Sequence, residues 1–93
     1  MSDSEQQFWD LVTELIDDAN HKASGEGQVL VSDAMLYAAA RFNAYTAAAA
    51  TAERAEFKAE LVDIKALLME QFEAMLEANL DDYLENYKVY LER

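Results

Sequence analysis

The sequence predicts an all-α protein, an antiparallel bundle of three to four helices with a central alanine-rich helix and a long C-terminal helical segment. The 93 residues include two glycines and no proline, whereas alanine, leucine and glutamate, which favour helix, are abundant. The hydrophobic fraction of 53% is too high for a disordered acidic tail, so the chain is expected to fold. Its length fits a single helical domain over residues 1–93.

The first expected helix begins at Ser4, which forms a capping-box pattern with Gln7 three residues later. The helix is expected to end within residues 24–27, which hold both glycines of the chain, because glycine readily adopts the conformations that end helices. Between these ends, apolar residues recur with the spacing of one helix face. They are Phe8, Leu11, Val12, Leu15, Ile16, Ala19 and Ala23.

The second expected helix is the alanine-rich one. Residues 29–31 are interpreted as an extended link, and Ser32 is expected to start the helix as its N-cap. No residue within 42–52 is charged, and a helix that is apolar on most sides is buried on most sides, so this helix is expected at the centre of the bundle. Residues 47–51 leave two alternatives open, a turn with Thr51 as the next N-cap or an uninterrupted helix.

The C-terminal segment is expected to hold a third helix and a last one, with a fresh cap at Asn79 between them. The third helix directs a set of apolar residues inward. They are Phe57, Leu61, Ile64, Leu68, Phe72, Met75 and Leu76.

Nineteen acidic residues against seven basic ones give a net charge of −12. Because affinity for phosphate comes from lysine and arginine, this balance argues against a nucleic-acid partner, and anionic lipid would repel the chain as well. No stretch approaches the length of about 18 apolar residues that spans a membrane. The absence of cysteine and the polar, acidic N-terminus predict a cytoplasmic protein.

Carboxylates form a stripe along the third helix and are expected to face water, opposite the apolar residues. The stripe comprises Glu56, Asp63, Glu70 and Glu77 at seven-residue spacing, with Glu53, Glu60 and Glu73 beside them. Three bases of the same helix, Arg54, Lys58 and Lys65, have no acid three or four residues away. They are expected to meet Asp10, Glu14 or Asp17 across a helix pair.

No metal ligand, cofactor-binding residue or catalytic residue is assigned. The one histidine, His21, lies three and four residues after Asp18 and Asp17, which is a metal-ligand spacing. A single histidine supplies too few ligands for a closed site, and its place near a helix C-terminus is favourable without a metal.

Two groups of residues are the candidate sites. Arg41 is the charged residue expected to be buried, beside a carboxylate, and with Asn43 it forms the candidate ligand or polar core site. The candidate interface is aromatic, because tyrosine can bury a large apolar ring while its hydroxyl stays solvated. The tyrosines are expected to share one helix face. This interface comprises Trp9, Tyr83, Tyr87 and Tyr90.

Three blocks of the sequence resemble a family of small acidic proteobacterial proteins that is classed as a domain of unknown function. They are Ser-Asp-Ser-Glu-Gln-Gln-Phe-Trp-Asp at 2–10, Ala-Ala-Ala-Arg-Phe-Asn-Ala at 38–44 and Asn-Leu-Asp-Asp-Tyr-Leu-Glu-Asn-Tyr at 79–87. The resemblance spans almost the whole chain. It implies no catalytic residue, because the family has no assigned active site.

The sequence therefore predicts a non-enzymatic interaction or regulatory domain, a homodimer whose acidic surface meets a basic protein partner. The alternative is a divalent-metal-dependent hydrolase of the all-α nucleotide pyrophosphohydrolase type, because paired Glu-x-x-Glu motifs on facing helices hold Mg²⁺ or Mn²⁺ in such enzymes. Its residues would be Glu53, Glu56, Glu70 and Glu73. A third hypothesis is a nucleic-acid mimic that occupies the basic cleft of a DNA-binding protein.

Overall fold

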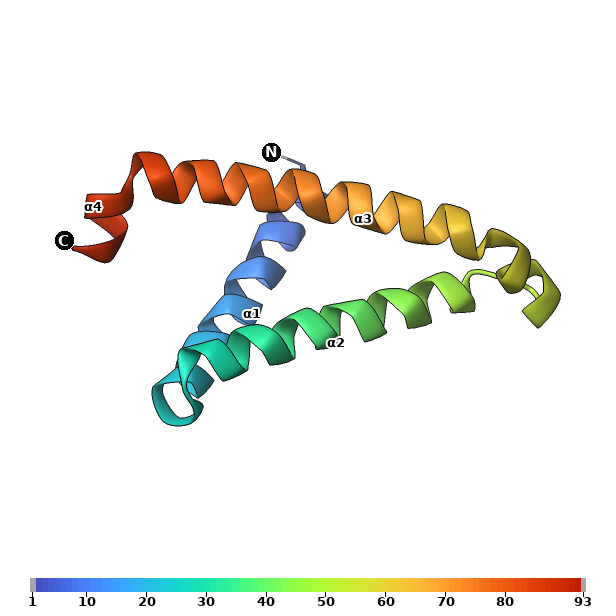
Figure 1. Ribbon diagram of the computed structural model, residues 1–93, viewed down its shortest axis with the longest axis horizontal. Helices are drawn as coiled ribbons and strands as arrows, with labels where there is room; N and C mark the ends of the chain where they lie inside the picture. Colours follow the sequence, from blue (N-terminus) through green and yellow to red (C-terminus); the bar gives the residue numbers. More distant parts are fainter. Residues whose placement is uncertain (1, 93) are drawn as a thin grey trace. The chain divides into compact units, whose positions relative to one another are not determined.

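The computed structural model describes residues 2–92, and over that range it contains four helices and no strand (Figure 1). The prediction of an all-α chain with a long C-terminal helical segment is confirmed. The helices are α1 (Asp3–Glu26), α2 (Gln28–Ala49), α3 (Arg54–Glu85) and α4 (Tyr87–Leu91).

The chain divides into two units, Met1–Thr46 and Ala47–Arg93. The first unit holds α1 and most of α2, and the second holds α3 and α4. The prediction of a single domain over the whole chain stays a prediction.

The start of α1 lies earlier than the sequence pattern predicted. The N-cap is Ser2, whose hydroxyl accepts a hydrogen bond from the backbone N–H of Glu5 at 3.2 Å. The capping pair is therefore Ser2 with Glu5, not Ser4 with Gln7. Starting the helix at Ser2 places two acidic residues in the first turn, where the helix dipole favours negative charge.

Gly27 separates α1 from α2, and the two helices diverge from it (Figure 1). Its φ of 97° and ψ of 140° are a backbone conformation that side chains with a Cβ rarely adopt, and its N–H donates to the carbonyl of Ala23 at 3.1 Å. Its own carbonyl accepts the N–H of Val31 at 3.2 Å, inside α2. The prediction of an extended link over 29–31 was wrong, because one glycine suffices for the change of direction.

The chain turns between α2 and α3, so residues 47–51 do not continue as one helix into α3. The backbone N–H of Thr51 donates to the carbonyl of Ala48 at 3.1 Å, and its hydroxyl donates to the same carbonyl at 2.7 Å. Thr51 thus satisfies a carbonyl at the end of α2, and the predicted role of Thr51 as N-cap of the next helix was wrong.

The N-cap of α3 is Glu53, whose side chain makes no capping bond. The carboxylate of Glu56 instead accepts the backbone N–H of Ala52 at 2.9 Å. A residue in the first turn of α3 therefore satisfies a donor of the preceding turn, as the acidic member of a capping box does.

The break near the C-terminus lies later than predicted. Asn79 is inside α3, where its side-chain amide donates to the carbonyl of Met75 at 2.7 Å, so the prediction of a cap there was wrong. The helix ends at Asn86, whose φ of −109° and ψ of 27° depart from helical values.

No described residue of either unit is buried. In the alanine-rich α2, which was predicted to be covered on most sides, Phe42 is 70% exposed and Tyr45 is 71% exposed. The apolar helix faces exist as predicted, but α1 and α2 diverge, so the first unit does not cover α2 (Figure 1).

Gly27→Ala is expected to destabilise the protein by about 1–3 kcal/mol, because alanine is strained at this φ. Gly25→Ala is the matched control: this glycine is helical and nothing lies within 4 Å of an added Cβ, so helix propensity favours alanine by up to about 1 kcal/mol. Urea unfolding followed by far-ultraviolet circular dichroism measures both. Equal stability of the two variants would contradict the role of Gly27.

Candidate interaction surfaces

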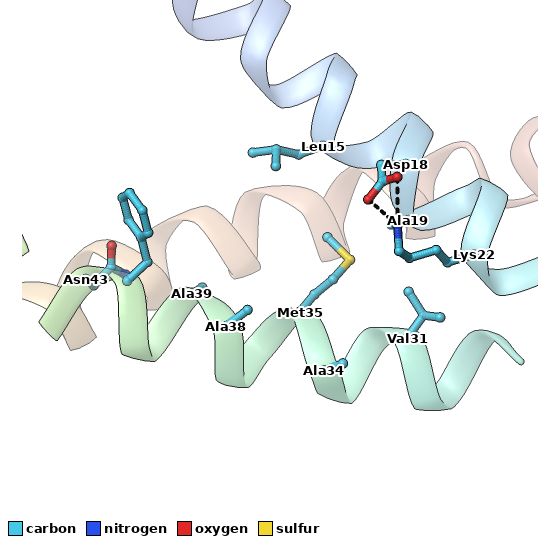
Figure 2. Close-up of a pocket in the computed structure, with 11 residues that line it drawn as sticks. Leu15, Asp18, Ala19, Lys22, Val31, Ala34, Met35, Ala38, Ala39 and Asn43 are labelled. Atoms are coloured by element: carbon cyan, nitrogen blue, oxygen red, sulfur yellow. Dashed lines mark hydrogen bonds and ion pairs between the residues drawn. The ribbon is translucent and has the colours of Figure 1, made fainter. Parts of the chain in front are cut away.

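An apolar cleft of about 620 Å³ lies between α1 and α2 in the first unit (Figure 2). Leu15 and Ala19 contribute from α1, and Met35 and Phe42 contribute from α2. The α2 residues of the cleft recur at helical spacing, so one face of α2 forms one wall. They are Val31, Ala34, Met35, Ala38, Ala39, Phe42 and Asn43.

One ion pair borders this cleft. The ammonium of Lys22 lies 2.8 Å from Oδ1 and 2.9 Å from Oδ2 of Asp18, four residues earlier on α1 (Figure 2). Both side chains are more than half exposed, so the pair contributes only about 0.3–0.5 kcal/mol. Its effect is to add a polar edge to an otherwise apolar surface.

The structure does not bring Arg41 and Asn43 together. Asn43 lines the cleft, whereas Arg41 does not, because a separation of two residues places side chains about 200° apart on a helix. Both are exposed, so the first unit does not bury Arg41 beside a carboxylate. Their role as a ligand site stays a prediction.

Trp9 is exposed in the first turns of α1. Its ring meets the edge of the Phe8 ring, with centroids 4.9 Å apart and planes at 80°. Phe8 is 52% exposed and Trp9 is 54% exposed, so the pair is an aromatic surface that the first unit leaves open.

The C-terminal tyrosines lie on two helices. Tyr83 belongs to α3, while Tyr87 and Tyr90 belong to α4, so the expectation of one continuous tyrosine face was wrong. The turn at Asn86 nonetheless brings Tyr83 and Tyr90 together, with ring centroids 4.6 Å apart. We call residues 82–91 the C-terminal hook.

Asp82 organises the C-terminal hook. The side-chain amide of Asn86 donates to its carbonyl at 3.2 Å and to its Oδ1 at 2.9 Å. The hydroxyl of Tyr90 donates to its Oδ2 at 2.9 Å. Sequence reasoning missed Asp82 and Asn86, although Asp82, Asn86 and Tyr90 at four-residue spacing are a signal that could have found them.

The hydrogen bond to Asp82 raises the pKa of Tyr90 above its usual range. Loss of the proton would break this bond and place two negative charges side by side. The repulsion between these charges also raises the pKa of Tyr90. Tyr90 is therefore held in its neutral form.

The carboxylates of α3 serve local structure or face solvent. Among the described residues there is no group of three or more histidine, cysteine, aspartate or glutamate side chains that could hold a metal ion. Of the four residues in the hydrolase alternative, Glu56 caps a backbone N–H and Glu53 is an N-cap.

Ion pairing among the described residues is limited to Asp18 with Lys22. Within the second unit, the described residues place no carboxylate in an ion pair with Arg54, Lys58 or Lys65, and the expected pairs with acids of the first helix stay a prediction. No helix in the described range is both long and apolar enough to cross a membrane.

Comparison with known proteins gives one match. A family model described as "Protein of unknown function (DUF3144)" matches residues 8–84. The comparison with curated proteins and the comparison with solved structures gave no match.

Titration of the tyrosines tests the C-terminal hook. The raised pKa of Tyr90 is expected to give a late-ionising component, and Tyr90→Phe is expected to remove it. Tyr45→Phe, which changes a 71% exposed ring on α2, is the control and is expected to leave the late component in place. Tyrosinate absorbance against pH measures both.

The same contact makes stability depend on pH. The folded-state pKa of Tyr90 lies above its unfolded value, so the stability that the Tyr90–Asp82 hydrogen bond contributes is fully present below a pH of about 10. It is lost as pH rises through the folded-state pKa. A late component that persists in Tyr90→Phe would assign the shift to another residue.

Proposed function

Because the chain belongs to DUF3144, a family of proteins of unknown function, its surfaces are the guide to its role, and we propose that it is a non-enzymatic interaction module that assembles with itself. In this proposal the apolar helix faces bind a second copy. The carboxylates on the outside of the assembly bind a basic protein partner.

The observation that carries the proposal is the exposure of large apolar side chains in each unit, with no buried core among the described residues of either unit. Soluble monomers rarely expose contiguous apolar patches larger than a few hundred Å². Here such side chains are exposed on every helix, including Leu36 at 58% on α2 and Leu84 at 78% on α3. Helices in proteins gain most of their stability from the packing of an apolar face, so these faces need cover.

The exposed faces support a second copy as the cover. In a two-fold dimer the same patch is buried on both chains, so each apolar face that one unit leaves open can pack against the identical face of the second copy.

Charge supports the second part of the proposal. The carboxylates at 56, 63, 70 and 77 lie on the side of α3 opposite its apolar face, so they stay on the outside when that face is covered. A net charge of −12 per chain attracts basic proteins and raises their association rate. The proposal places this interaction in the cytoplasm and assigns no role to nucleic acid, membrane or cofactor.

Sedimentation equilibrium is expected to give a mass of at least twice the chain mass of 10.5 kDa. Phe42→Ala is expected to cost about 3–5 kcal/mol, because the ring is buried in the assembly. If the chain does not assemble and the Phe42 ring stays exposed, Phe42→Ala would change the free energy of unfolding by only about 0.5 kcal/mol or less. Asp63→Ala, on the acidic side of α3, is the control with little expected change. A monomer whose stability is insensitive to Phe42→Ala contradicts the proposal.

Affinity capture tests the basic partner. The triple variant Glu60→Gln, Asp63→Asn and Glu70→Gln removes three charges from the outer side of α3 and is expected to keep the assembly. A basic protein that wild type retains is expected to be lost with the variant and to elute from wild type at high salt. Equal recovery by both proteins would show that the acidic side is not the binding surface.

A further inference from the structure

We propose that α3 of one chain pairs antiparallel with α3 of a second copy, so that the half of each helix that carries the bases lies against the wholly acidic half of the other. This inference rests on the proposed self-association and names the surface that makes it. It follows from the apolar face of α3, from the position of its bases and from the distribution of its charges.

The bases of α3 lie on its apolar face. At about 100° per residue, Arg54, Lys58 and Lys65 fall within about 40° of one another around the helix. Leu61 and Phe72 fall in the same sector, and Phe72 is 45% exposed. The acids occupy the remaining circumference, so covering the apolar face also covers three positive charges.

Those charges have no ion-pair partner among the described residues of their own unit. No acid lies three or four residues from Arg54, Lys58 or Lys65, and the described residues place no carboxylate within ion-pair distance of them. Lysine and arginine can extend their charged ends past apolar neighbours, but on a covered face they need carboxylates at its edge. In the proposed pair, the second copy supplies them.

The charges of α3 are distributed unequally along its length. Residues 54–69 hold three basic and three acidic side chains, whereas residues 70–85 hold six acidic side chains and no basic one. A parallel pair would place each base beside the same base of the second copy. It would also place the six carboxylates of one acidic half beside the six carboxylates of the other. An antiparallel pair instead places the three bases of each chain alongside the acidic half of the other, and two-fold symmetry repeats the arrangement.

The register follows from the length of the helix. Its centre lies between Met69 and Glu70, so in an antiparallel pair residue i is level with residue 139 − i. Lys65 is then level with Ala74, next to Glu73 at the edge of the apolar face. Arg54 and Lys58 lie alongside residues 81–85 of the second copy, which hold three carboxylates, and Asp82 is the one of these nearest the edge of the apolar face.

Spin labels on the outer side of α3 test the pairing, since the chain has no cysteine and each label site can be introduced alone. In the antiparallel pair, labels at Glu70→Cys are separated by about 1.5 Å along the helix axis, and labels at Glu60→Cys by about 29 Å. Double electron–electron resonance is expected to give a much longer distance for Glu60→Cys. Both sites lie on the acidic side, so neither label disturbs the paired face.

The outcomes separate this inference from the proposed function. Equal distances at both sites indicate parallel pairing and overturn the inference, as does a dimer in which neither site shows coupling, while self-association stands. A monomeric mass with no coupling overturns both.

Charge exchange provides a second test. Lys65→Glu is expected to raise the dimer dissociation constant at least about tenfold, whereas Lys88→Glu, on α4, is expected to change it less than about threefold. Adding Glu73→Lys to Lys65→Glu is expected to restore affinity. Within one chain these residues lie about 12 Å apart along the helix, so rescue reports a contact between chains. Absence of rescue in variants that keep wild-type helicity overturns the register.

Discussion

A helix in water is marginally stable until its apolar face is covered, and this constraint governs the whole molecule. The chain forms helices of 24, 22 and 32 residues, yet no described residue of either unit is buried. Its ion pair and helix caps contribute about 1 kcal/mol each at most, which does not offset the conformational entropy of ordering helices of this length. The free energy of folding therefore depends on contacts beyond those within each unit, and the exposed apolar faces are where such contacts form.

The net charge of −12 limits which of those contacts can form. Association of two acidic chains is opposed by repulsion unless the carboxylates lie away from the interface. In α3 the acids lie on one side, while Arg54, Lys58 and Lys65 lie among the apolar residues. Covering the apolar face of α3 therefore buries apolar side chains and keeps the carboxylates away from the interface at the same time. The unequal charge of the two halves of α3 adds a direction to that face, which apolar spacing alone does not.

The helix ends depend on local hydrogen bonds. Ser2, Thr51 and Glu56 satisfy backbone groups that helices leave unpaired at their ends, and Gly27 adopts a backbone conformation that other residues rarely adopt. Asp82 joins Asn86 and Tyr90 in the C-terminal hook. Sequence patterns predicted caps at Ser4, Thr51 and Asn79 instead, because side chains of the types that cap helices also occur inside helices and in turns. Geometry then selects the residue whose side chain reaches an unpaired group.

The sequence by itself determined the all-α class, the stop at the glycines and the spacing of apolar and acidic residues. Each depends on propensity or periodicity within one helix, which a local pattern records. The tertiary structure decided that Tyr83 and Tyr90 meet, that Asn43 lines a cleft between α1 and α2, and that the apolar faces stay uncovered within each unit. These outcomes depend on the directions of successive helices, which a few backbone angles at Gly27 and Asn86 determine and which periodicity does not encode.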